Sequence, residues 1–184
     1  MAVAQAEPKL MTGEELLEMG DIGPAELVEG VLVPMSPTQS LHGWIVMELA
    51  RRLGNFNAER RVGWILGAES GFVTRRDPDT IRGMDVAFIS RRRMPALATG
   101  FLEVAPELVV KVVSPSDRWA DIRGKIAEYF HAGVEQVWII EPFAQKLLIY
   151  NTPTDFVELL GADTLQGEGI LEGFQLSLSE LFEQ

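Results

Sequence analysis

A lysine occupies the middle of the segment that most clearly predicts a buried strand. Lys111 lies in the run 107–113, whose other members are one glutamate, one leucine and four valines. This composition predicts a buried strand. An ammonium group there is costly unless an anionic partner or an open cleft receives it. Lys111 is therefore a candidate for contact with an anionic group, and the alternative is a strand near the sheet edge from which Lys111 reaches solvent.

An aspartate precedes a second apolar run. Asp85 is followed by Val86, Ala87 and Phe88 and stands at the start of the strand that we predict over 84–89. A carboxylate there is a candidate metal ligand, because Mg²⁺ prefers oxygen ligands. The alternative is an aspartate at a strand end or turn with a purely structural role.

Four charged residues follow one stripe of a helix predicted over 117–132. Asp117, Asp121, Lys125 and Glu128 are spaced by four, four and three residues, so they share one helix face. Asp121 and Lys125 have the favourable orientation for an i,i+4 ion pair of about 0.2–0.5 kcal/mol. Lys125 is thus either part of a site or half of a solvent-exposed helix pair.

Composition excludes several classes of site. The chain has 184 residues, no cysteine and two histidines, which rules out disulfides, thiolate metal sites and multi-histidine metal sites. The sequence contains no Walker loop, no Gly-x-Ser-x-Gly motif and no Gly-rich dinucleotide turn. No apolar run approaches the roughly 20 residues of a membrane-spanning helix, and residues 1–10 lack the apolar stretch of a signal peptide. We expect a cytoplasmic protein with no membrane association and a flexible tail over 1–10.

The charge is distributed unevenly along the chain. The net charge is −11, yet residues 51–93 hold ten arginines and only five acids. A positive segment of this kind is typical of a groove for a phosphate backbone. The alternative is that these arginines pair with the acidic C-terminal third, residues 135–184. The sequence leaves both interpretations open.

The order of predicted elements indicates the fold class. Helices are predicted over 12–20, 36–53 and 117–132, with a short C-terminal helix from 179, and strands over 25–35, 60–66, 71–75, 84–89, 107–113, 137–140, 146–150 and 156–160. We expect one α/β domain over 1–184, with a central mixed β-sheet flanked by helices on both faces.

Several of these segments together resemble a known family. They comprise Ala25 to Leu32, Met35-Ser36-Pro37 followed by His42, Arg82 to Phe88, Pro106 to Arg118, Asp121, Lys125, Glu128-Tyr129 and Gly133 to Trp138. Over roughly residues 10–182 the chain resembles the Uma-type family of "putative restriction endonucleases", part of the PD-(D/E)-x-K nuclease superfamily. The resemblance implies a restriction-endonuclease-like core.

The resemblance also implies an activity and its residues. Members of this superfamily are metal-dependent nucleases, so we expect a DNA endonuclease that hydrolyses phosphodiester bonds with Mg²⁺ or Mn²⁺. Asp85 matches the metal-binding aspartate, and Glu26 matches an additional acid, a candidate metal ligand and catalytic residue. Lys125 matches the catalytic lysine, which this family supplies from the helix after the strand.

Further residues are candidates for contact with DNA. His42 matches a histidine at the start of a helix and would line the cleft. Arg82, Arg91, Arg92 and Arg93 belong to the basic segment and are the candidate DNA-binding arginines. Because restriction-type enzymes often cut both strands as dimers, a homodimer is also an expectation.

The sequence departs from the family pattern at two positions. Met84 replaces a proline, which shapes the backbone and binds nothing. Lys111, a third candidate catalytic residue, replaces a glutamate that would be the second metal ligand, and this substitution puts the metal itself in question. Glu107 shares the strand face but lies about 13 Å away at the usual rise per residue, so it cannot replace that ligand.

Three hypotheses remain at this point. The first is an active, metal-dependent endonuclease. The second is a nuclease fold without catalysis that binds nucleic acid or a protein, in which Lys111 and Asp85 form an ion pair. The third is an interaction domain with no nucleic-acid role, consistent with the acidic remainder of the chain.

Overall fold

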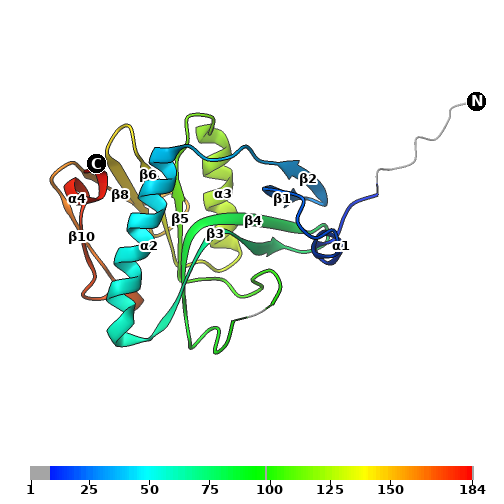
Figure 1. Cartoon of the computed structure of the whole chain (residues 1–184), viewed down its shortest axis with the longest axis horizontal. Coiled ribbons are helices and arrows are strands. Elements are labelled where there is room, and N and C mark those ends of the chain that lie inside the picture. The colour runs from blue at the N-terminus through cyan, green and yellow to red at the C-terminus, as the bar shows by residue number, and fades with distance from the viewer. Residues whose placement is uncertain (1–8, 98, 184) are drawn as a thin grey trace, which may run out of the picture.

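A mixed β-sheet forms the centre of the computed structural model, which describes residues 9–97 and 99–183 (Figure 1). Its strands are β1 (Ala25–Val28), β2 (Val31–Pro34), β3 (Gly63–Arg75), β4 (Thr80–Ser90), β5 (Leu108–Val112), β6 (Gln136–Glu141), β7 (Lys146–Tyr150) and β8 (Phe156–Leu160). The strand order is β2-β1-β4-β5-β6-β7-β8, with β3 paired to β4. Among the paired strands of the described residues, β5 and β6 are the parallel pair, so the predicted mixed sheet is confirmed. The predicted tail over 1–10 falls mainly on residues 1–8, outside the described part.

Helices cover both faces of this sheet. They are α1 (Gly13–Glu18), α2 (Ser40–Arg60), α3 (Trp119–His131) and α4 (Leu178–Phe182); η1 (Gly169–Leu171) is a 3-10 turn beside the small sheet of β9 (Thr164–Gln166) and β10 (Gln175–Ser177). Val110 and Val112 pack with α2, whereas Val109 packs with α3. Because successive strand residues point to opposite faces, α2 and α3 lie on opposite sides of the sheet. The predicted two-sided arrangement is therefore confirmed.

Helix α2 packs through one apolar stripe. Ile45, Leu49 and Leu53 are completely buried, and each such side chain stabilises the fold by about 1.5–3 kcal/mol. The helix extends to Arg60, beyond the predicted end at 53, and Arg61 closes it in the left-handed conformation. This anchored helix holds its first turn, which contains His42, against the sheet.

Three strand predictions were wrong in their bounds. The strand predicted over 25–35 is the hairpin of β1 and β2, because Glu29 and Gly30 both adopt positive φ and turn the chain. The strands predicted over 60–66 and 71–75 are one bulged strand, β3. Its pairing extends β4 back to Thr80, four residues before the predicted start.

The sheet is split along one edge of β4. Strand β3 pairs with one edge of β4 along most of its length. On the other edge, β5 pairs with Val86 to Phe88 and β1 pairs with Ile81. Residues 82–85 lie between these two pairings, at the point where β1 and β5 separate. We call this place the sheet split.

Within the described residues, none of the helices has the length and apolar character required to cross a membrane.

Candidate active site at the sheet split

Asp85 and Lys111 face each other across the sheet split. Strands β4 and β5 are antiparallel, and Val86 pairs with Val110. One residue further along the same register, residue 85 stands opposite residue 111. Lys111 Nζ lies 3.4 Å from Asp85 Oδ2 and 3.5 Å from Asp117 Oδ2. The ion pair that the second hypothesis predicts is thus present, and Lys111 has the anionic partner that its apolar strand required.

Asp85 stays ionised in this setting. Burial alone would raise the pKa of Asp85, but His42, Lys111 and the Val112 amide together hold this pKa below its usual value. The Val112 N–H donates to Asp85 Oδ2 at 2.7 Å. Burial likewise lowers the pKa of Lys111, yet Asp85 and Asp117 raise it overall. Both partners are therefore charged at neutral pH.

His42 lies against the same carboxylate from the first turn of α2. Its side chain is only 6% exposed, and its Nε2 is 3.4 Å from Asp85 Oδ2. Neither ring nitrogen makes a hydrogen bond to any described residue. Nε2 is thus within ion-pair distance of Asp85, and the buried Nδ1, which has no described partner, is the ring atom left for a ligand atom.

Glu26 centres a second cluster on the α3 side of the sheet split. It lies 2.8 Å from Lys125 Nζ and 2.9 Å from Arg82 Nη1, and it accepts from the Gly83 N–H. Arg82 also binds Glu128 at 2.7 Å, and these two carboxylates raise the pKa of Arg82 against the lowering effect of its burial. Lys125 thus contacts Glu26 of β1 in place of the helix partner Asp121. The cluster joins β1, β4 and α3 around the site.

Glu69 is a member of the site that the sequence analysis missed. The register with β4 slips between Gly67 and Ser70, so Ala68 and Glu69 both stand opposite Asp85. Both have positive φ, near 55–60°, and such strained bulges often re-aim a side chain beside an active site. Burial, followed by the charge of Asp85, raises the pKa of Glu69. Among the described residues, Glu69 makes no ion pair.

Three predicted DNA-binding arginines lie away from this centre. Arg91 to Arg93 follow β4, about 20 Å along the strand from Asp85 at the usual rise per residue. Arg93 contacts Glu107 at 3.0 Å and also Glu135, and Arg91 covers the Trp64 ring at 3.8 Å. Arg92 is 80% exposed and lies 3.9 Å from Glu107.

The basic segment is mostly neutralised within the protein. Arginines of this segment form ion pairs with Glu26, Glu29, Glu48, Asp79, Glu103, Glu107, Glu128, Glu135 and Glu180. Pairing is thus extensive, as the second interpretation expected. Its partners are mainly outside the C-terminal third, of which only Glu135 and Glu180 take part.

The residues at the sheet split do not fit the divalent metal that the resemblance implies. The Lys111 ammonium lies against the carboxylate that would bind the ion, and Asp85 Oδ2 already accepts from Val112. Within residues 9–97 and 99–183, no three histidine, aspartate or glutamate side chains are placed to hold a metal. A cation would also be repelled by Lys111.

The fold is a mixed α/β sheet with helices on both faces, and its site combines buried acidic and basic groups. A solved structure described as a "putative nuclease belonging to DUF820", from Anabaena variabilis, is similar over 94% of this chain and 97% of that one, with a TM-score of 0.79 and 18% identity. The model of the Uma2 family, described as "Putative restriction endonuclease", matches residues 14–179. The chain belongs to this family, as the resemblance predicted. A search among curated proteins found no match.

Proposed function

We propose that this chain binds the phosphate backbone of DNA at the sheet split and does so without a divalent metal. The observation that carries the proposal is the position of Lys111. Its ammonium lies 3.4 Å from Asp85 and 3.5 Å from Asp117, and 22% of its side chain is exposed. A cation in this position can bridge a buried carboxylate and a phosphate oxygen, because an ammonium has three donors.

The first turn of α2 supports an anionic ligand at the same place. The first N–H groups of a helix have no partner within the helix, and they favour anions. Gln39 supplies no side-chain cap, and this turn contains no acidic residue. His42, with both ring nitrogens buried and unbonded, lies in this turn and adds a possible donor. Such donors favour an anionic ligand such as a phosphate group.

The proposal corresponds to the second hypothesis, a nuclease fold that binds nucleic acid without metal-dependent catalysis. Lys111 supplies a fixed positive charge, whereas hydrolysis in the family is expected to need a metal-bound water. The expected homodimer and cytoplasmic location remain predictions, because the position of Lys111 bears on neither of them.

The binding test compares two lysine variants. Fluorescence anisotropy in EDTA measures the affinity for a labelled DNA oligonucleotide across a salt series. Lys111→Met should weaken binding about 3- to 10-fold and reduce the salt slope by about one, as expected for one lost phosphate contact. Lys146→Met is the matched control, because Lys146 pairs with Glu158 on β8 and with no other described residue. Equal affinities for wild type and Lys111→Met would overturn the proposal.

One observation favours a second candidate, the metal-dependent DNA endonuclease. Glu69 adds a carboxylate beside Asp85 at the level where Lys111 replaces the family glutamate. Incubation of plasmid with Mg²⁺ or Mn²⁺ tests this candidate. Cleavage by wild type that is lost in Asp85→Ala would replace the first proposal. Intact plasmid with wild type would exclude the second.

A further inference from the structure

A pocket adjoins the sheet split on the side of α1. Its volume is about 350 Å³, and its walls are mainly apolar, formed by Leu16, Leu17, Ile22, Ile81 and Phe101. Two acidic residues also line it, Glu69 from β3 and Asp21 from the loop after α1. Concave, mostly apolar pockets with one or two polar groups are the usual sites for small ligands and ring systems.

Two glycines keep the pocket open. A Cβ atom at Gly71 would overlap the Phe101 ring, and one at Gly83 would overlap the Glu69 carboxylate. The Glu69 side chain therefore crosses the backbone of β4 at Gly83 while the Phe101 ring lies against β3. The absence of these two side chains creates the space in which the ring and the carboxyl group face the pocket.

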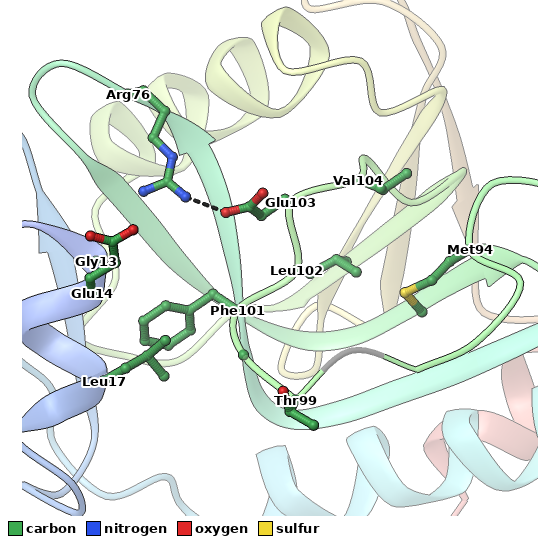
Figure 2. Close-up of a pocket in the computed structure, with 11 residues that line it drawn as sticks. Gly13, Glu14, Leu17, Arg76, Met94, Thr99, Phe101, Leu102, Glu103 and Val104 are labelled. Atoms are coloured by element: carbon green, nitrogen blue, oxygen red, sulfur yellow. Dashed lines mark hydrogen bonds and ion pairs between the residues drawn. The ribbon is translucent and has the colours of Figure 1, made fainter.

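Phe101 and Leu17 separate this pocket from a neighbouring one. Figure 2 shows the Phe101 ring beside Leu17 of α1 in that neighbour, which has a volume of about 340 Å³. There Arg76 and Glu103 are paired with each other, Arg76 also binds Asp79, and Glu14 is a further carboxylate of the lining. Glu69, in contrast, makes no ion pair with a described residue. The pocket beside Glu69 is the one whose polar group also stands opposite Asp85 at the sheet split.

The pocket and the proposed phosphate site meet at Glu69. The bulge sets Glu69 opposite Asp85, and the Glu69 side chain also lines the pocket. On the far side of Asp85 lie Lys111 and the unbonded His42. Asp85 therefore lies between the apolar, aromatic pocket and the two groups suited to a phosphate oxygen, Lys111 and His42.

We infer that the pocket receives one unstacked base of single-stranded DNA while the adjoining phosphate lies at Lys111. The inference rests on the proposed function and names the substrate class of that site. A nucleobase is a flat ring with polar edges, so its face fits against Phe101 and its edge can bond to the Glu69 carboxyl. A base within a duplex is stacked and paired, and removing it from the stack is costly. The site therefore prefers a single strand.

The test compares three labelled DNA ligands of equal length in EDTA. They are a single strand, the same strand with abasic sugars at its central positions, and the duplex. Wild type should bind the single strand at least about fivefold more tightly than the other two, in line with the usual value of one base–aromatic stack. Equal affinity for all three ligands would overturn the inference.

Variants of the ring sharpen this test. Phe101→Leu keeps apolar bulk and should remove most of the preference for the intact strand, while the affinity for the abasic strand stays unchanged. Phe143→Leu is the control, because Phe143 is 73% exposed and outside the pocket. Thermal unfolding checks that Phe101→Leu is folded. A folded Phe101→Leu variant that retains the full preference contradicts the inference.

Failure of the two proposals can be told apart. If the phosphate site is wrong, Lys111→Met binds the abasic strand as wild type does. If only the base pocket is wrong, Lys111→Met weakens binding to all three ligands and no preference for the single strand is seen.

Discussion

The Lys111 ammonium lies 3.4 Å from the Asp85 carboxylate, across two antiparallel strands of the central sheet. The family resemblance leads us to expect a glutamate at position 111, and this chain has a cation there instead. The pair neutralises a buried carboxylate without a metal ion. The proposed function follows from the positive charge of Lys111 at a position where a negative charge is expected.

Stability should depend on Asp85 in a pH-dependent way. The pKa of Asp85 is lowered in the folded protein, so its contribution is present above the unfolded pKa and is lost as the pH falls through the folded value. Asp85→Asn should lower the free energy of unfolding by about 1–3 kcal/mol at pH 7, because Lys111 loses its buried partner. Urea unfolding between pH 3 and 7 measures this effect.

The control for this variant is Asp155→Asn, which alters an exposed aspartate in the turn before β8. The difference between wild type and Asp85→Asn should shrink as the pH approaches 3. A difference that is constant across the whole range would contradict the charge-based explanation.

Arg92 and Arg93 are neighbours in the sequence, but we expect only Arg93 to contribute to the stability of the fold. Arg93 contacts Glu107, Glu135 and the Ala105 carbonyl, so Arg93→Ala should lower the free energy of unfolding by about 1–3 kcal/mol. Arg92 is 80% exposed, so Arg92→Ala should change it by less than about 0.5 kcal/mol. Chemical unfolding of both variants measures this difference. Equal losses of unfolding free energy in the two variants would contradict the prediction.

Acid unfolding should also report on Glu48 of α2. Hydrogen bonds from Arg51 and Arg52 lower the pKa of Glu48 from 4.5 to about 2. Its stabilising effect is therefore complete above about pH 4.5 and is lost as the pH falls toward 2. In Glu48→Gln, thermal unfolding should show a flatter pH dependence across this window. A curve parallel to that of wild type would be inconsistent with the observed arginine contacts.

Long, strongly patterned segments were predictable from the sequence alone. The strand around Lys111 and helix α3 lie close to their predicted positions, because an apolar run and a helical repeat are local signals. The mixed sheet also followed from the order of elements. The hairpin of β1 and β2 did not, since Glu29 adopts positive φ without being a glycine.

The candidate site was only partly predictable, for a physical reason. Asp85, Glu26 and Lys125 were located by resemblance, but the contact between Lys125 and Glu26 joins residues 99 positions apart. Local spacing favoured Asp121 as the partner. Glu69 belongs to no motif, and its position depends on how β3 slips against β4. The only sequence signal was the interruption of the apolar pattern between Gly67 and Gly71.

Calorimetric titration with Mn²⁺ tests the central claim most directly. Wild type should bind no ion at the sheet split, whereas Lys111→Glu should gain one site that Asp85→Ala abolishes in the double variant. Lys146→Glu, the control for an added negative charge, should gain none. Mn²⁺ binding by wild type that disappears in Asp85→Ala would contradict the account, because it would show a working metal site despite Lys111.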